Sequence, residues 1–336
     1  LARPAVLTDA YWFKPRTHIT TNDHIRGWKK QKGKTSGGMS GLHFGQYKAH
    51  LKDRLLATFD ASMQSVAYTT GYLLRQWKKG LDVQLIKKPN DYRATNLRTI
   101  LLLEPDHNMN NKAIGSHAMR MGERLMEHAR DNYGGRRGLR AAEVSMNQLL
   151  TYNSLWARRG RAIIMSNDAK GGNDQIAHTV VNLALQRLGI PKPALQSMLA
   201  TIQEMDHHIR TAFGDSAESY GNNPLQPPPQ GILQGSGSGP AGWASIAAVI
   251  TKAMRDHGFG YDAWSLIRQR ALVIVGFAFV DDTDLIHAIR DRKVPTIQLL
   301  AEAQEALALW ENLLHATGGA LAPEKSYWYL VEVTRA

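Results

Sequence analysis

Short apolar runs, of a length that suits buried strands, alternate with longer stretches of helical periodicity along this chain. Apolar and β-branched side chains cluster in predicted strands at residues 97–104, 161–166, 273–280, 283–289 and 327–333. Helical spacing of apolar side chains predicts helices at residues 112–128, 141–156, 240–257 and 297–317. Residues 214–239 are rich in Pro, Gly, Ser and Asn, which predicts a loop. The pattern therefore predicts strands connected through helices.

Two adjacent acids, Asp281 and Asp282, separate the apolar run at residues 273–280 from the run at 283–289. The simplest geometry for this pattern is a β-hairpin with the acids at its apex. Aspartate pairs are also common at ordinary turns, where they bond their own backbone. A third acid, Asp168, follows the strand predicted at residues 161–166. Because two-metal phosphoryl transfer needs carboxylates from separate strands, these three aspartates are candidate metal ligands.

The composition narrows the class of protein. The 336 residues include 41 lysines and arginines against 29 aspartates and glutamates, a formal net charge of +12. This charge favours a polyanionic partner, either nucleic acid or an anionic membrane surface. No apolar run reaches the roughly 18 residues of a membrane-spanning helix. The absence of cysteine excludes disulfides, thiolate zinc sites and a cysteine nucleophile.

The N-terminal region adds two weaker signals. The chain begins at Leu1 with neither a methionine nor a signal-like segment, so we expect part of a longer, intracellular protein, nuclear or cytoplasmic. The basic run at residues 28–34 is either a solvated surface or a direct nucleic-acid contact. Gly33-Lys34-Thr35 is similar to the end of a P-loop, but Trp28 stands where that motif requires glycine, so we reject it.

A glycine pattern at residues 237–242 satisfies a dinucleotide-binding motif and would suit a dehydrogenase. That motif follows a β-strand and is followed by an acid about 20 residues later. Neither is clear here, so the dehydrogenase is the weakest of the functions considered.

Six segments, taken in order, carry a resemblance to a known family. They are Arg98 with Ile100, Arg136-Arg137, residues 168–174, Gln234-Gly235-Ser236, residues 279–282 and residues 319–325. Their order and spacing resemble reverse transcriptases, particularly the non-LTR retrotransposon type and related open reading frames of microbial eukaryotes. The resemblance extends from about Leu81 to Val333. Within that family, residues 97–114 are similar to the fingers strand motif, 231–243 to the template-gripping loop and 322–326 to the late palm motif.

The resemblance implies a role for each matching residue. Asp168 and Asp281 would be the ligands of two Mg²⁺ ions, with Mn²⁺ as the substitute and Asp282 as a weaker auxiliary ligand. Arg98, Arg136 and Arg137 are the candidate triphosphate contacts, and the sequence leaves open which arginine of the pair serves. Gln234 and Gly235 would lie beside the nascent base pair, or belong to a plain Gly/Ser linker. Lys325 would lie near the pyrophosphate, or be a solvated surface lysine.

The chain departs from the family pattern at two places. Family members usually carry an aromatic side chain five positions after the first catalytic aspartate, where it blocks the 2′-hydroxyl of a ribonucleotide; this chain has Asn173. We therefore predict weakened discrimination against ribonucleotides, or a copy drifting toward inactivity. Viral RNA-templated RNA polymerases place a polar acid at the same offset, which keeps that class as a minor alternative, although Gln234-Gly235-Ser236 favours a reverse transcriptase. The chain also ends 11 residues after Lys325, which leaves no room for a thumb.

The resemblance thus implies an α+β right-hand polymerase fragment, with an antiparallel palm sheet backed by helices. We expect a basic N-terminal extension at residues 1–70, fingers at 71–155 and palm at 156–336. The implied function is RNA-directed DNA synthesis in a retrotransposon-like element, with an RNA template, a DNA primer and dNTPs as partners and no membrane. The main alternative is a catalytically inactive nucleic-acid-binding protein derived from such a polymerase.

Overall fold

The computed structural model describes residues 18–93, 96–170, 174–223, 225–232, 234–265, 269–289, 291 and 293–333. The chain forms two compact units whose segments interleave along the sequence. Unit 1 comprises residues 1–121 and 185–239, and unit 2 comprises residues 122–184 and 240–336. This is a division by packing, and the expected division into extension, fingers and palm stays a prediction.

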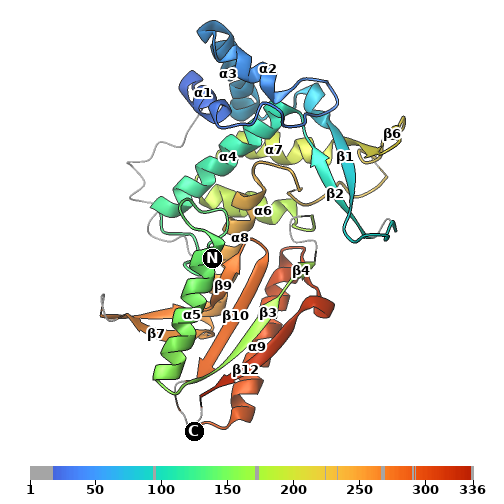
Figure 1. Ribbon diagram of the computed structural model, residues 1–336. Coiled ribbons are helices and arrows are strands. Elements are labelled where there is room, and N and C mark those ends of the chain that lie inside the picture. The colour runs from blue at the N-terminus through green and yellow to red at the C-terminus, as the bar shows by residue number, and fades with distance from the viewer. Residues whose placement is uncertain are drawn as a thin grey trace. The chain divides into compact units, whose positions relative to one another are not determined.

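Unit 1 combines helices with a mixed four-stranded sheet (Figure 1). Its helices are α1 (Thr21–Lys29), α2 (Phe44–His50), α3 (Arg54–Thr70), the short η3 (Arg75–Lys78), α4 (Pro105–Arg124), whose last turn belongs to unit 2, and α7 (Lys192–Gln203). Its strands are β1 (Lys79–Ile86), β2 (Leu97–Leu102), β5 (Asp206–Thr211) and β6 (Gly214–Asp215). The order is β2-β1-β5-β6, and β1 runs antiparallel to β2 but parallel to β5.

Trp28 is the centre of the packing between α1, α2 and α4. Its ring is fully buried and stacks on Tyr47, with 4.6 Å between the ring centroids. Phe44 meets it edge-on at 5.5 Å, and Met109 of α4 completes the cluster. The basic run at residues 28–34 therefore starts with a core residue, while the lysines at 29 and 30 are exposed.

Unit 2 contains the predicted hairpin and the strand that precedes Asp168. Its helices are α5 (Ala141–Ala157), α6 (His178–Arg187), which continues into unit 1, α8 (Gly239–Asp256), α9 (Thr296–Ala316) and the short η5 (Pro323–Lys325). Its strands are β3 (Arg161–Asn167), β4 (Ala169–Lys170), β7 (Tyr261–Ser265), β8 (Arg270–Ile274), β9 (Gly276–Phe279), β10 (Asp282–Ile289), β11 (Ala320–Leu321) and β12 (Tyr327–Glu332).

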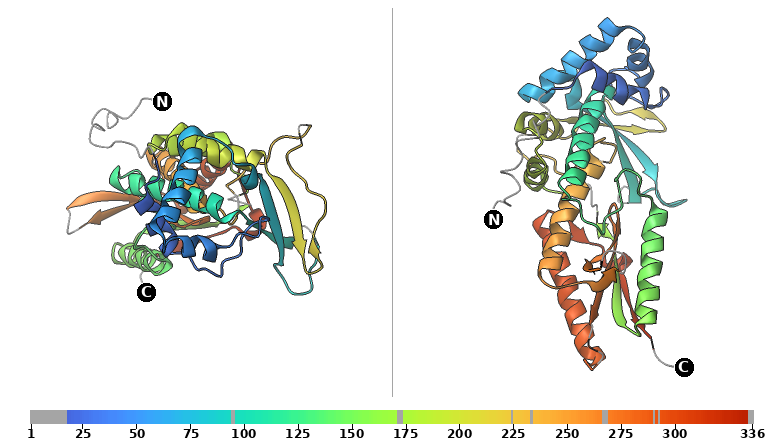
Figure 2. Two further views of the ribbon diagram at one scale, coloured as in Figure 1. Left: turned by 90° about the horizontal axis from the view of Figure 1, so that it is seen from above. Right: turned by 90° about the vertical axis from the view of Figure 1, so that its left-hand side faces the viewer.

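The main sheet of unit 2 is antiparallel, in the order β12-β3-β10-β9. Side chains alternate between its two faces. Ile164 and Ile286, which are paired across β3 and β10, pack with Leu155 of α5. On the other face, His287 Nε2 lies 3.1 Å from Glu302 Oε2 of α9. Figure 2 (right) shows α5 and α9 on opposite sides of these strands. The predicted α+β chain with an antiparallel sheet backed by helices is confirmed.

Most predicted elements of unit 2 are confirmed to within one residue at each end. These are the strands β3, β10 and β12 and the helices α5, α8 and α9. None of the helices in the described part of the chain is long and apolar enough to span a membrane.

The strand predicted at residues 273–280 is two strands, so that prediction is wrong in part. β8 ends at Ile274 and pairs with β7, whereas β9 begins at Gly276 and pairs with β10. Between them, the backbone N–H of Val275 donates to Asp131 Oδ1 at 3.2 Å. A Cβ on Gly276 would lie 2.6 Å from the carbonyl oxygen of Asp284, so glycine permits the close approach of β10. The break depends on these distant partners, which an apolar run does not reveal.

The helix predicted at residues 112–128 is wrong at both ends, because α4 includes the polar residues from Pro105 onward and ends at Arg124. Proline suits the first turn of a helix, and an acid such as Asp106 interacts favourably with the helix dipole there. Two of the polar side chains that suggested a loop, Asn110 and Asn111, are buried and donate hydrogen bonds to other segments. Asn110 donates to Ser197 Oγ at 3.2 Å, and Asn111 donates to Ser236 Oγ at 3.3 Å.

Candidate active site

The turn between β9 and β10 carries the two adjacent acids. Phe279 pairs with Asp282, so Val280 and Asp281 form a two-residue turn. Val280, the first of the two turn residues, has a φ of 61°, whereas Asp281 is not among the residues with positive φ; a positive φ at the first position alone is typical of a type II′ hairpin turn. A β-branched residue adopts this conformation only where its surroundings hold it there. The predicted hairpin with acid at its apex is confirmed.

Two neighbours hold this turn in place. Trp243 of α8 donates its indole N–H to the carbonyl oxygen of Val280. Gly134 lies so close that a Cβ there would be 2.2 Å from the backbone nitrogen of Val280. The chain before Gly134 runs beside β9, where the Tyr133 N–H donates to the carbonyl oxygen of Ala278 at 2.9 Å. Asp281 and Asp282 therefore lie at a turn that is held by contacts with α8 and with the segment around Gly134.

Asp168 follows β3 directly, beside the start of β10. Asn167 pairs with Thr283, so Asp168 and Asp282 both adjoin that pair on neighbouring strands. Residues opposite each other in an antiparallel pair have Cβ atoms about 5 Å apart. By the alternation of the strands, Asp168 and Asp282 share the sheet face that carries Ile164 and Ile286. Acids distant in the sequence thus meet at one end of the sheet.

A cleft of about 550 Å³ lies over this end of the sheet, within the size range of small-molecule sites. Its lining includes Asp168, Asp282, Asp284, Gln148 of α5, Phe279 and Lys325. Asp281 lies in the turn, next to these residues but outside the lining. The cleft therefore brings together the candidates Asp168, Asp282 and Lys325.

Burial and the neighbouring acids shift the pKa of Asp282. Burial raises this pKa above its ordinary value of 3.8, and the charges of Asp281, Asp168 and Asp284 raise it further. Lys325 opposes them and lowers it. Repulsion between like charges raises a carboxyl pKa, and a cation placed between the carboxylates reduces that repulsion. The cleft therefore favours a positively charged occupant.

Lys325 already supplies one positive charge. Its Nζ lies 2.6 Å from Asp168 Oδ2, and this hydrogen bond raises the pKa of Lys325. The chain around it folds over Asp168, because β11 pairs with β4 and the Ala322 N–H donates to the carbonyl oxygen of Asp168 at 2.9 Å. The first acid and the late motif of the resemblance therefore meet.

The donor atoms suit a hard divalent ion. Carboxylate oxygens are the ligands that Mg²⁺ and Mn²⁺ prefer, and Asp168, Asp281 and Asp282 supply them. Among the described residues, however, no group of three or more His, Cys, Asp or Glu side chains is arranged to hold a metal ion. The three aspartates thus have the right ligand atoms for a divalent metal ion. Any such ion would compete with Lys325 for Asp168.

The two arginines of the predicted phosphate-binding turn differ in their surroundings. Arg136 donates from Nε and Nη2 to Glu123, at 2.7 and 2.9 Å, and from Nη1 to the carbonyl oxygens of Ala129 and Asn132, at 3.1 and 3.0 Å. Its side chain is 16% exposed. Arg137 is exposed. Arg137 is therefore the better placed of the pair to meet a phosphate group.

Three other candidates, Arg98, Gln234 and Gly235, belong to unit 1 and lie along β2. Arg98 is exposed on this strand. The carbonyl oxygen of Gln234 accepts from the Leu101 N–H at 3.0 Å. Gly235 has a φ of 117°, and a Cβ there would lie 2.3 Å from the carbonyl oxygen of Leu101. The predicted template loop thus docks on the strand that carries Arg98. Asn173 lies outside the described residues.

The structure does not support a dinucleotide-binding role for the glycine pattern at residues 237–242. It leads into α8, but the described residues immediately before it form turns instead of a strand. A dinucleotide-binding motif needs that strand to place its glycines under the pyrophosphate. The dehydrogenase therefore has no structural support here.

Two residues of the cleft were not predicted. Asp284 Oδ2 accepts from Gln148 Nε2 at 3.0 Å, and the charge of Asp284 helps to raise the pKa of Asp282. Asp284 follows Asp282 by two positions, so strand periodicity alone would have placed both on one face. Gln148 stands 136 positions from Asp284, and no local pattern indicates the contact.

Comparison of the sequence with protein-family models and with curated proteins finds no match.

Proposed function

We propose that this chain is the fingers and palm of an RNA-directed DNA polymerase from a retrotransposon-like element. It would transfer nucleotides from dNTPs to the 3′-hydroxyl of a DNA primer on an RNA template. The observation that carries the proposal is that Asp168, after β3, adjoins the β9–β10 hairpin that bears Asp281 and Asp282. Two-metal nucleotidyl transfer requires such carboxylates from separate strands. The net charge of +12 also suits a nucleic-acid partner.

In this proposal the three aspartates hold Mg²⁺ or Mn²⁺. The metal, when bound, activates the primer hydroxyl and neutralises charge on the reacting phosphates. Lys325 is protonated, because its pKa is raised, and it lies beside the same carboxylate. Lys325 would supply a positive charge or a proton to the departing pyrophosphate, in place of its present hydrogen bond to Asp168.

The remaining residues would hold the substrates. Arg137 is the proposed triphosphate contact of unit 2, since Arg136 is held by Glu123 and two carbonyl oxygens. Arg98, Gln234 and Gly235 of unit 1 would contact the incoming nucleotide and the template, as the resemblance implies. Asn173 would set the choice between ribose and deoxyribose.

Primer extension tests the proposal, using the chain joined to a thumb segment and an RNA template with a DNA primer. We expect metal-dependent addition of dNTPs that falls by at least about 100-fold in Asp168→Asn and in Asp281→Asn. Asp256→Asn is the matched control, because this acid pairs with Lys252 on the exposed face of α8. Adding ribonucleotides to the same assay tests the prediction for Asn173. If the unmutated chain with its thumb adds no nucleotide, the enzymatic proposal fails.

A second candidate is a catalytically inactive nucleic-acid-binding protein derived from such a polymerase. Two observations favour it. Lys325 already pairs with Asp168, and the described residues hold no ready-made metal site. This candidate predicts RNA binding that weakens steeply with salt, with no nucleotide addition. The primer-extension assay therefore separates the two candidates.

A further inference from the structure

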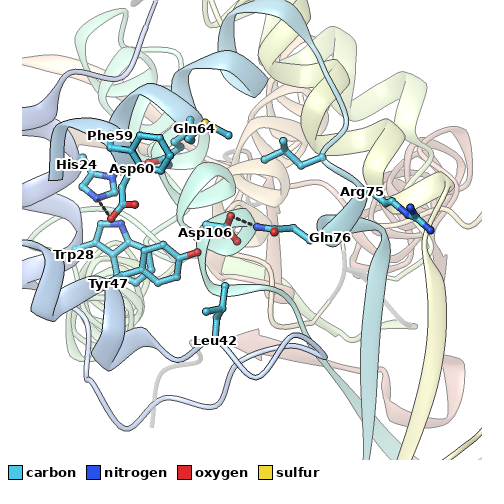
Figure 3. Close-up of a pocket in the computed structure, with 12 residues that line it drawn as sticks. His24, Trp28, Leu42, Tyr47, Phe59, Asp60, Gln64, Arg75, Gln76 and Asp106 are labelled. Atoms are coloured by element: carbon cyan, nitrogen blue, oxygen red, sulfur yellow. Dashed lines mark hydrogen bonds and ion pairs between the residues drawn. The ribbon is translucent and has the colours of Figure 1, made fainter. Parts of the chain in front are cut away.

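Unit 1 contains a pocket of about 360 Å³ that the proposed polymerase function does not use. It lies between α1, α2, α3 and the start of α4, and Figure 3 shows its lining. Its lining includes the aromatic residues Tyr47 and Phe59, with the buried Trp28 behind Tyr47. Two carboxylates enter it from different elements, Asp60 from α3 and Asp106 from the first turn of α4. Aromatic faces combined with acids favour an organic cation.

His24 gives an independent indication of a ligand. Its side chain lines the pocket and is 2% exposed, and its Nδ1 lies 3.1 Å from Gln64 Oε1. Because this amide oxygen only accepts, Nδ1 donates to it. Nε2 has no hydrogen-bond partner in the described part of the chain. Burial lowers the pKa of His24, so the ring is neutral and Nε2 presents a lone pair.

That lone pair faces a carboxylate. Nε2 of His24 lies 3.9 Å from Asp60 Oδ2, too far for a hydrogen bond (Figure 3). Asp60 Oδ2 is also 2.8 Å from Nδ1 of His50, which approaches from α2. His24 Nε2 and the Asp60 carboxylate are therefore two acceptors that lie side by side in the wall with no donor between them. A ligand with several N–H groups would satisfy both.

The second carboxylate is held by neutral donors. Asp106 accepts from Gln76 Nε2 at 2.7 Å and from the His107 N–H at 3.0 Å. Burial raises its pKa, as expected where charge has little compensation. Burial also raises the pKa of Tyr47, and the charges of Asp106, Asp60 and Glu104 raise it further. A chain with a net charge of +12 thus concentrates negative potential in this pocket.

We propose that this pocket binds a guanidinium group carried on an aliphatic stem, the chemistry of an arginine side chain. A guanidinium is planar and has five N–H donors in a fixed fork, so it can meet Asp60, His24 and Asp106 in different directions. Its faces stack on aromatic rings, here those of Tyr47 and Phe59. An ammonium group is a compact point charge and would satisfy fewer of these acceptors. The inference is independent of the polymerase function.

Calorimetric titration of the full chain tests the proposal, with Nα-acetyl-arginine methylamide as the probe. The matching citrulline compound has the same shape without the charge. We expect the arginine probe to bind, and the citrulline probe to bind at least about tenfold more weakly. Asp60→Asn and Asp106→Asn should each weaken binding of the arginine probe by about tenfold or more. Asp91→Asn is the control, because this acid of unit 1 pairs with Arg93 away from the pocket.

Two further variants, at Phe59 and Arg75, test whether the arginine probe binds in this pocket. Phe59 is 62% exposed, so Phe59→Ala should leave the fold intact and weaken binding by about two- to fivefold if the ring stacks on the cation. Arg75 lines the pocket, but its guanidinium points away from both acids (Figure 3). Equal affinity for the arginine and citrulline probes, or no binding at millimolar concentrations, would overturn the proposal. Binding that appears only in Arg75→Gln would also overturn it, since Arg75 of the same chain would then be the occupant.

Discussion

The ammonium group of Lys325 lies 2.6 Å from the carboxylate of Asp168, although 157 positions separate the two residues in the chain. The pair forms because β11 joins β4 directly after Asp168, and the short helix η5 then returns Lys325 over the strand end. The pair links the first proposed metal ligand to the last segment of the family resemblance. It also gives Asp168 a cationic partner from the protein itself.

Replacing Lys325 by Gln is expected to have two opposite effects. Divalent ions should bind more tightly, because their competitor for Asp168 is gone. The gain should stay below about tenfold, since an exposed ion pair contributes about 1 kcal/mol or less. Nucleotide addition should become slower, because the pyrophosphate loses a cation. Mn²⁺ titration and primer extension measure the two effects, with Lys325→Arg as the charge-preserving control. Unchanged Mn²⁺ affinity together with unchanged extension would show that Lys325 has no part in the site.

Asp282→Asn is expected to stabilise the fold at neutral pH. The pKa of Asp282 is raised in the folded chain, chiefly by burial and then by Asp281 and Asp168. Folding therefore favours the protonated carboxyl. The stability that it contributes is fully present below its ordinary pKa of 3.8 and is lost as the pH rises through the folded pKa. The gain should be below about 1 kcal/mol, because solvent screens this partly exposed group.

Thermal unfolding of Asp282→Asn at pH values on both sides of this range measures the effect. The variant should unfold at a higher temperature than the unmutated chain at neutral pH and at the same temperature in acid. Asp256→Asn, which removes an acid from an exposed ion pair, is the control. A stabilisation of equal size at both pH values would mean that ionisation of Asp282 is not its cause.

Gly134→Ala is expected to disturb the turn between β9 and β10. The added methyl group would lie 2.2 Å from the backbone nitrogen of Val280, so the hairpin or the segment beside it must move. We expect a loss of about 1–3 kcal/mol in the free energy of unfolding, the usual cost of overpacking. Gly319→Ala is the matched control, since its nearest contact would be an ordinary 3.5 Å. Chemical denaturation measures both, and equal losses would refute the tight packing of Gly134 on the hairpin.

The two arginines of the turn should respond differently to substitution. Arg136→Lys removes paired hydrogen bonds to Glu123 and should destabilise the fold by about 1 kcal/mol at neutral pH. Arg136 lowers the pKa of Glu123, so this stabilisation is present above the ordinary pKa of 4.5 and is lost as the pH falls through the folded pKa.

Arg137→Lys should leave stability unchanged at every pH, because the side chain is exposed. If Arg137 contacts the triphosphate, the same change should raise the KM for dNTPs several-fold, since lysine lacks the planar fork that matches phosphate. Denaturation curves and steady-state extension kinetics separate the two roles. A rise in KM for Arg136→Lys without loss of stability would reverse the assignment.

Local patterns predicted the elements that carry the site. Apolar runs gave β3 and β10, and the adjacent acids marked the turn between β9 and β10. The pairing of β3 with β10 then brings Asp168 opposite Asp282. Both of these strands were predicted from their apolar patterns. Helical spacing predicted α5 and α9, the two helices that cover the sheet.

Contacts between distant segments account for what the sequence did not reveal. The break between β8 and β9 depends on Asp131, which accepts from Val275 across 144 positions. The early start of α4 depends on partners for Asn110 and Asn111 in other segments of unit 1. The sequence left open whether Arg136 or Arg137 meets the triphosphate, because the pairing of Arg136 with Glu123 is a property of the folded chain.

The most direct test of the account is to count divalent ions in the chain by Mn²⁺ electron paramagnetic resonance. The sample would contain an RNA template, a DNA primer that lacks its 3′-hydroxyl, and the matching dNTP. We predict two bound Mn²⁺ ions per chain, with affinity reduced by at least about tenfold in Asp168→Asn and in Asp281→Asn but unchanged in Asp256→Asn. If no Mn²⁺ binds under these conditions, or if it binds equally well without Asp168 and Asp281, these acids do not form a metal centre and the polymerase proposal is contradicted.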